Sequence, residues 1–167
     1  IRSLDPSSVL DIGVGFGKWG FLCREYLEVW KDRVKKDEWE MQIDGVEIFP
    51  DYHDSLQPYL YNRLFYKDAR EFEPDKVYDL VMACDVVEHM PKQDGLDLIH
   101  KMSSSWASNC IVSLPLGDEW MRNCYGRNPH DAHQAVWNDN DLGREWQRIK
   151  VTVPGGRQIG IFFKGSG

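Results

Sequence analysis

Hydrophobic residues along this chain fall into short runs that are separated by polar stretches and by Gly or Pro. Runs bounded in this way are typical of buried strands. The expected strands cover residues 8–12, 42–48, 63–66, 78–83, 110–114, 147–153 and 158–163. Pro115 is expected to end the fifth strand. The last two strands flank Pro154-Gly155-Gly156, a turn sequence that predicts an antiparallel hairpin.

Between the strands, the hydrophobic period changes to that of a helix. From residue 18 onward, apolar side chains recur every three or four residues and form one face, with Arg24 and Glu28 predicted off it. The apolar positions are Trp19, Leu22, Cys23, Tyr26, Leu27 and Trp30. We interpret this aromatic stripe as core packing. Residues 51–60 and 91–103 are expected to form two further helices.

Strands that alternate with helices in this order predict an α/β fold. We expect a doubly wound, mostly parallel seven-stranded sheet with a C-terminal antiparallel hairpin and helices on both faces. Residues 1–167 are expected to form a single domain, and because the chain opens at Ile1 rather than at Met, we expect an upstream segment as well. Ligands of such sheets bind beyond the carboxyl ends of the strands, so functional residues are expected directly after each strand.

Composition narrows the class of partner. The 167 residues include 20 Lys and Arg against 27 Asp and Glu, which gives a net charge of −7. A nucleic-acid binder usually presents a basic surface, so nucleic acid is disfavoured as a partner. No apolar run approaches the ~20 residues that cross a bilayer, and no membrane association is predicted. The four cysteines show no CxxC spacing, which favours reduced thiols and a cytoplasmic protein.

The stretch VLDIGVGFGKWGF, at residues 9–21, places a G-x-G-x-G run between a strand and a helix. Glycine permits close approach of a ligand, and the free N–H groups of a helix start attract an anion. Gly15 to Gly20 also fits the dinucleotide fingerprint G-x-G-x-x-G. However, the carboxylate of Asp11 precedes the glycines and would repel a pyrophosphate. It would attract a ligand with an ammonium group, such as the amino-acid end of S-adenosylmethionine.

At this point the sequence resembles the class I, Rossmann-like methyltransferases that use S-adenosylmethionine. DIGVGFG at 11–17 resembles the family's first motif, which wraps the methionine end of the cofactor. VEI at 46–48 resembles the end of its second strand, and KDAREF at 67–72 resembles its third motif. YDLVMACDVVEHM at 78–90 resembles the fourth strand and following loop of many small-molecule methyltransferases. The motifs occur in the family's order and extend over nearly the whole chain.

The resemblance implies S-adenosylmethionine as the cofactor and assigns roles to particular residues. Glu47 would hold the ribose hydroxyls, Asp68 would accept from the adenine amino group, and Ala69 would lie by the ring. The backbone of Cys84 and Asp85 would lie beside the methionine part. An exposed strand-end position for Glu47 and a helix-cap role for Asp68 stay open. The expected cofactor-binding residues are Asp11, Gly13, Val14, Gly15, Phe16, Gly17, Glu47, Ile48, Phe49, Asp68, Ala69, Cys84 and Asp85.

The methyl acceptor is less well marked. The Asn/Asp-Pro-Pro-Tyr/Phe motif of methyltransferases that act on base amino groups is absent after the fourth strand. The metal-dependent catechol type would need an Asn soon after the fifth strand, and none stands there. We therefore predict a small-molecule acceptor, with O-methylation favoured, and no metal. Residues 116–137 are expected to cover the acceptor pocket, with large side chains at Trp120, Met121, Arg122, Tyr125, His130, His133 and Trp137.

Histidine titrates near neutrality, so His89, His130 and His133 are the candidate general bases for an oxygen acceptor. We place His133 and His89 in this catalytic role, with a helix-start or core position as the alternative for His89. His130 and His133 have a spacing that is compatible with a metal, but the pair alone is a weak signal.

Two other functions stay open. An NAD(P)-dependent oxidoreductase is disfavoured by Asp11. It is also disfavoured by the 27 residues from Gly20 to Glu47, where the fingerprint expects about 20. The remaining alternative is a module that binds S-adenosylmethionine without turnover.

Overall fold

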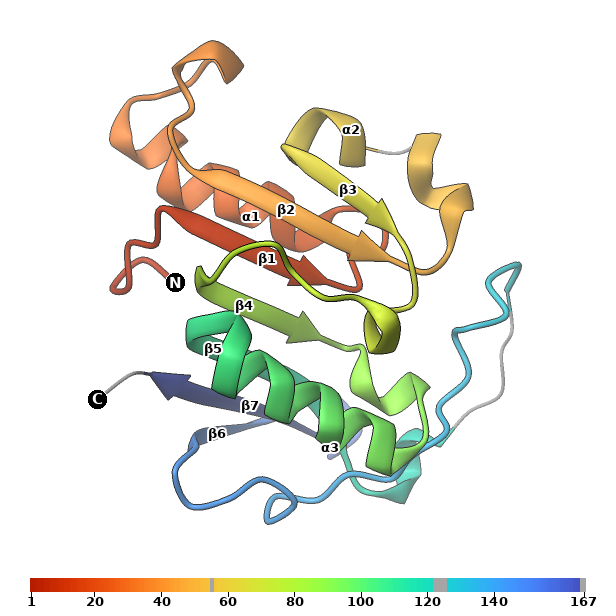
Figure 1. Cartoon of the computed structure of the whole chain (residues 1–167). Helices are drawn as coiled ribbons and strands as arrows, with labels where there is room; N and C mark the ends of the chain where they lie inside the picture. The colour runs from red at the N-terminus through yellow and green to blue at the C-terminus, as the bar shows by residue number, and fades with distance from the viewer. Residues whose placement is uncertain (55, 122–125, 166–167) are drawn as a thin grey trace.

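The computed structural model describes residues 1–54, 56–121 and 126–165. Its centre is a seven-stranded sheet in the order β3-β2-β1-β4-β5-β7-β6 (Figure 1). The strands are β1 (Ser8–Ile12), β2 (Gln42–Glu47), β3 (Arg63–Tyr66), β4 (Tyr78–Cys84), β5 (Ala107–Leu116), β6 (Gln147–Thr152) and β7 (Gln158–Gly165). The first five strands are parallel, and β7 pairs antiparallel with both β5 and β6. The predicted sheet and C-terminal hairpin are confirmed.

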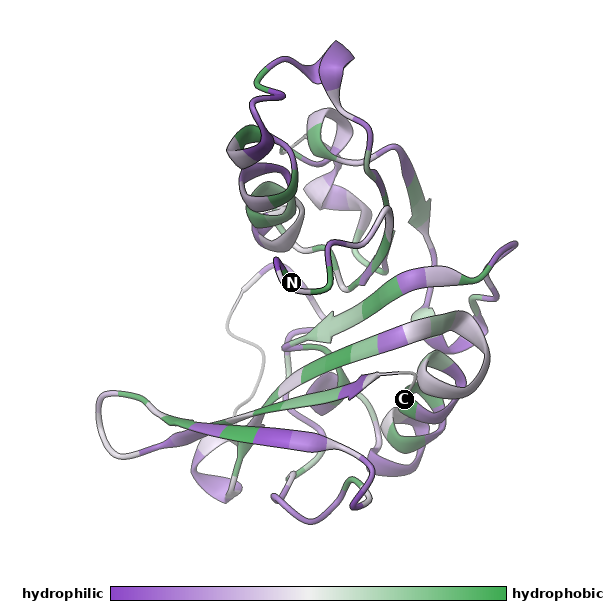
Figure 2. Cartoon of the chain, turned by 90° about the vertical axis from the view of Figure 1, so that its left-hand side faces the viewer, coloured by the Kyte–Doolittle hydropathy of each residue, from purple (hydrophilic) through white to green (hydrophobic). Residues whose placement is uncertain are grey.

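Helices cover both faces of the sheet, as predicted. Figures 1 and 2 place α1 (Lys18–Leu27) and α3 (Lys92–Lys101) on opposite faces. The predicted helix at 51–60 is instead two short segments, η3 (Pro50–Asp54) and α2 (Gln57–Leu60). The remaining helical turns are η1 (Val29–Lys31), η2 (Lys36–Glu38), η4 (Ala69–Glu71), η5 (Val87–His89), η6 (Met102–Trp106) and η7 (Asp118–Trp120). Among the described residues, no helix is both long and apolar enough to cross a membrane.

The core consists of two hydrophobic clusters, one on each face of the sheet. Leu98 and Ile99 of α3 belong to one cluster, and Cys23 and Leu27 of α1 belong to the other. The strands supply the rest, and Figure 2 shows that hydrophobic residues follow the central strands. Cys23, Cys84 and Cys110 are buried free thiols, and Cys124 lies outside the described residues.

Two charged residues that were predicted to lie off the apolar face of α1 are buried, although Lys18 on the same side is exposed. Arg24 is 4% exposed and Glu28 is fully buried. Arg24 donates to the carbonyls of Leu60 (2.9 Å) and Met41 (2.6 Å), and Glu28 accepts from the backbone N–H of Met41 (2.6 Å). These partners lie outside the helix, in residues 31–41 and in α2. The hydrophobic periodicity within the helix therefore could not predict them.

Two further boundaries differ from the prediction. The helix ends at Leu27, so Trp30, the last member of the stripe, is 55% exposed instead of packed in the core. Pro115 does not end β5, because it pairs with Ile159 of β7. The pairing of β5 with β4 extends only to Ser113, so the proline has a neighbouring strand on one side alone. A missing N–H is tolerated at such a position.

Candidate functional site

The carboxyl ends of β1, β2 and β4 surround a cavity, which is where the sequence predicts a ligand. The predicted residues that line it are Gly13, Gly15, Glu47, Ile48, Asp68, Ala69, Asp85 and His89. His130, a candidate base in the sequence, also lines it. The cavity has further lining residues for which no cofactor or catalytic role was predicted: Val46, Tyr52, Lys67, Arg70, Val86, Met90, Asn128, Asp131 and Gln134. Most of these residues directly precede or follow a predicted site residue in the sequence. Extending each predicted position by one residue would therefore have included them.

The glycine loop after β1 opens toward the cavity. Gly13 and Gly15 have positive φ angles of +74° and +55°. The N–H of Gly13 donates to the carbonyl of Val46 at 2.8 Å. A Cβ at Gly13 would lie 2.4 Å from Cγ2 of Val86, whereas a Cβ at Gly15 would meet no atom within 4 Å. The first glycine is therefore required by packing, and the second leaves space on the cavity side.

Glu47 joins the glycine loop to the segment after β2. Its side chain accepts from the N–H of Gly15 at 2.7 Å and from the N–H of Phe49 at 2.8 Å, one bond to each carboxylate oxygen. Glu47 is 5% exposed, so the alternative of an exposed strand-end acid was wrong. Each oxygen has further acceptor capacity for hydroxyl groups of a ligand.

Asp68 caps the turn η4 and also lines the cavity. It accepts from the backbone N–H of Arg70 at 2.9 Å and from the guanidinium of the same residue. The Arg70 hydrogen bonds hold the pKa of Asp68 below its usual range. Arg70 also donates to Asp94 at 2.9 Å. The cap role of Asp68 is therefore confirmed, and its carboxylate stays charged at the rim of the cavity.

Asp11 lies beneath the glycine loop and is not among the residues that line the cavity. It is fully buried and accepts from the hydroxyl of Tyr61, which itself accepts from the N–H of Gly20 at 3.0 Å. Burial raises the pKa of Asp11 to about 7, although the bond from Tyr61 opposes the shift. Asp11 therefore supports the glycine loop through its bond with Tyr61 and does not face the ligand cavity.

The raised pKa of Asp11 predicts a loss of stability as the pH rises. The folded chain holds this proton up to about pH 7, whereas the unfolded chain releases it near 3.8. The stabilisation is therefore complete below pH 3.8 and disappears as the pH passes 7. In urea unfolding at pH 5.5 and 7.5, the wild type should lose about 2 kcal/mol more than Asp11→Asn, which cannot ionise. Equal losses in the two proteins would contradict this expectation.

Several predicted cofactor residues lie beside the cavity without lining it. Val14 is buried, Phe16 is 65% exposed, and Gly17 directly precedes α1. Phe49 packs edge-on against Tyr52, with the ring centroids 5.2 Å apart.

Cys84 and Asp85 lie at a second, largely apolar cavity between α1 and strands β4, β5 and β7. Burial raises the pKa of Cys84 to about 12, so its thiol stays protonated. Asp85 has a φ of +59°, donates its N–H to the carbonyl of Ser113 (2.9 Å), and lies 3.5 Å from Nζ of Lys18. Asp85 lines both cavities and therefore marks the place where they adjoin.

Residues 116–137 were expected to cover the acceptor pocket, and the C-terminal end of this segment is anchored in the hydrophobic core. Trp137 is fully buried in the core and packs against Gly95 of α3, so its predicted pocket role was wrong. His130 is exposed and lines the cavity. Arg122 and Tyr125 lie outside the described residues.

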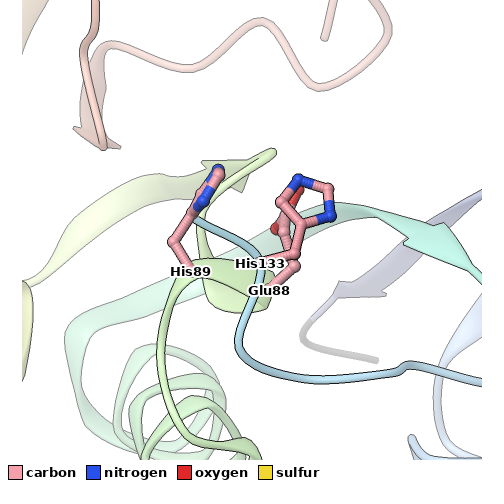
Figure 3. A group of neighbouring side chains, drawn as sticks. All are labelled: Glu88, His89 and His133. Atoms are coloured by element: carbon pink, nitrogen blue, oxygen red, sulfur yellow. The ribbon is translucent and has the colours of Figure 1, made fainter. Parts of the chain in front are cut away.

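The structure brings the two predicted catalytic histidines together. The rings of His89 and His133 lie 4.9 Å apart in an edge-on arrangement. Glu88, for which no role was predicted, completes the group (Figure 3). One potential ligand atom from each of the three residues lies within 4.8 Å of the others. His130, the histidine with metal-like spacing, is not part of this group.

No family model and no curated protein matches this sequence. The fold does match solved structures. A SAM dependent methyltransferase from Archaeoglobus fulgidus has a TM-score of 0.63 and 20% identity, over 93% of this chain and 84% of that one. A 1,6-didemethyltoxoflavin-N1-methyltransferase from Burkholderia thailandensis, solved with S-adenosylhomocysteine, has a TM-score of 0.63 and 13% identity, over 95% and 70%.

RNA methylases share the fold as well. An rRNA methylase from Escherichia coli has a TM-score of 0.57 and 16% identity over 96% of this chain. The chain spans only 57% of that enzyme and 56% of a 16S rRNA methylase. Sequence identities of 20% or lower show a shared fold and do not show a shared reaction or substrate. The chain therefore has the class I, Rossmann-like methyltransferase fold that its sequence motifs predicted.

Proposed function

We propose that this chain is an S-adenosylmethionine-dependent methyltransferase that acts on a small molecule, with a hydroxyl oxygen as the favoured acceptor. The observation that carries the proposal is the meeting of Gly13, Glu47 and Asp68 at one cavity beyond the ends of parallel strands. The glycine loop would hold the methionine end of the cofactor. Glu47 would bind the ribose hydroxyls, and Asp68 with Ala69 would bind the adenine.

The bond between Glu47 and Gly15 favours this cofactor over a dinucleotide. A pyrophosphate needs the N–H groups of the loop, but the N–H of Gly15 already donates to a carboxylate. The negative charge of that carboxylate would also repel phosphate. A ribose diol, in contrast, donates hydrogen bonds that a carboxylate accepts.

The charges around the cavity support a small-molecule acceptor over RNA. Arg70, at the cavity, is bound to both Asp68 and Asp94, and Lys18, at the adjoining apolar cavity, lies beside Asp85. Proteins that follow a nucleic-acid backbone place cations against the phosphates. Here acidic groups accompany these two cations, and the whole chain carries a charge of −7.

Methyl transfer requires the acceptor oxygen, the methyl carbon and the sulfur in one line. As the oxygen attacks, the carbon–sulfur bond breaks and its electron pair remains on sulfur, which yields S-adenosylhomocysteine. The hydroxyl proton must leave, and His89, at the cavity, and His133, beside it, are the candidate general bases.

Calorimetric titration with S-adenosylhomocysteine and, separately, with NADH tests the cofactor. We expect saturable binding of the former only, and binding of NADH alone would overturn the proposal. Transfer from isotopically labelled S-adenosylmethionine is then measured with two acceptor pools, hydroxylated small molecules and total RNA. Labelling of the small molecules supports the proposed acceptor class, and labelling of the RNA alone would overturn it.

A further inference from the structure

Glu88, His89 and His133 form a compact group of potential metal ligands (Figure 3). The first two residues end the turn η5, and His133 approaches them from the segment that leads to Trp137. Glu88 is 2% exposed and His133 is 9% exposed, while His89 is half-buried and lines the cavity. The group therefore reaches from the protein interior to the wall of the proposed cofactor site.

Hydrogen bonds from Gln134 to backbone carbonyls hold these two distant segments together. The N–H of Gln134 donates to the carbonyl of Glu88 at 2.7 Å, and its side-chain amide donates to the carbonyl of His89 at 2.6 Å. His133 precedes Gln134 directly, so these bonds fix its backbone against η5. Preorganised ligands of this kind lower the cost of gathering three side chains around an ion.

The hydrogen bond of His89 suits a metal ligand. Its Nδ1 lies 3.3 Å from the carbonyl oxygen of Ala132. A carbonyl can only accept, so Nδ1 is the donor in this bond, and Nε2 is the ring atom that would bind a metal. Metal-binding histidines commonly donate their second ring N–H to a carbonyl or carboxylate in this way.

We propose that Glu88, His89 and His133 bind one divalent transition-metal ion, of the class of Zn²⁺, Fe²⁺ or Co²⁺. Two imidazoles and one carboxylate suit these ions, whereas Mg²⁺ and Ca²⁺ prefer oxygen ligands throughout. Small side-chain rotations would bring the three atoms, now within 4.8 Å of one another, to the ~2.1 Å bond lengths that such ions need. Three protein ligands leave at least one position open for an outside molecule.

The role of the ion rests on the proposed function and deepens it. An acceptor hydroxyl at the open position would lose its proton to solvent water, because the ion makes that proton more acidic. The resulting oxyanion attacks the methyl carbon, and the electron pair of the broken carbon–sulfur bond passes to sulfur. The ion changes neither charge nor oxidation state. This role would replace direct proton transfer to histidine, and it departs from our sequence-based prediction that no metal is bound.

Titration of the chelator-treated protein with Co²⁺, followed by visible absorption and calorimetry, tests the site without any turnover. We expect one equivalent to bind with the spectrum of a nitrogen- and oxygen-ligated ion. His133→Ala and Glu88→Gln should each weaken binding by at least about tenfold. His100→Ala, in an exposed part of α3, should leave the affinity unchanged. Glu88→Gln keeps the size of the side chain and serves if His133→Ala fails to fold.

His130→Ala distinguishes the proposed site from an alternative metal site formed by His130 and His133. We expect it to bind Co²⁺ like the wild type, and a loss as large as that of His133→Ala would overturn the assignment. Absence of specific Co²⁺ and Zn²⁺ binding by the folded wild type would also overturn it. Titration of the same metal-free protein with S-adenosylhomocysteine reports on the cofactor independently. Failure of the metal site can thus be distinguished from failure of the proposed function.

Discussion

Gly13→Ala should destabilise the protein by about 2–4 kcal/mol and abolish measurable binding of S-adenosylhomocysteine. The new Cβ would lie 2.4 Å from Cγ2 of Val86, which no real contact allows, so the loop or the segment before η5 must move. The residue would also have to keep a φ of +74°, a region that L-residues avoid. Both elements line the cavity, so their displacement should disrupt the ligand site.

Gly15→Ala is the matched control, because it shares the positive φ but meets no atom within 4 Å. It should cost only about 1–2 kcal/mol, as expected for the backbone conformation alone. Adding Val86→Ala to Gly13→Ala removes the clash and should recover the difference between the two single variants. Urea unfolding measures all four proteins. Equal destabilisation by the two glycine substitutions would show that the contact with Val86 does not matter.

Glu47→Gln should weaken binding of S-adenosylhomocysteine at least tenfold, or about 1.4 kcal/mol. The carboxylate now accepts from the N–H groups of Gly15 and Phe49, one on each oxygen. A carboxamide would place an NH₂ against one of these donors and would present fewer acceptors to a ribose. The effect on affinity should therefore combine a distorted loop with lost contacts to the ligand.

Calorimetry on Glu47→Gln is compared with Glu40→Gln, whose side chain is 76% exposed and does not line the cavity. The control should bind like the wild type. If Glu47→Gln loses stability but keeps its affinity, the residue supports the loop without touching the cofactor, and its assigned ribose role is wrong.

Local patterns in the sequence were sufficient for the strands, their order of appearance and the glycine loop. β1 and β3 have the predicted bounds, because a short apolar run between turn residues has few alternatives to a buried strand. Gly13, Glu47 and Asp68 could be predicted as a group for a related reason. Each follows a strand, and parallel strands carry their carboxyl ends to the same edge of the sheet.

Features that depend on partners distant in the sequence could not be predicted. Arg24 and Glu28 follow a polar pattern along α1, yet the backbone of Met41 lies against them and buries them. Glu88 and His133 are 45 residues apart, and hydrogen bonds such as those of Gln134 to η5 hold them as neighbours. A periodicity records which side of an element is apolar. It does not record which remote segment supplies a buried hydrogen bond, and such bonds are what form the Glu88–His89–His133 group.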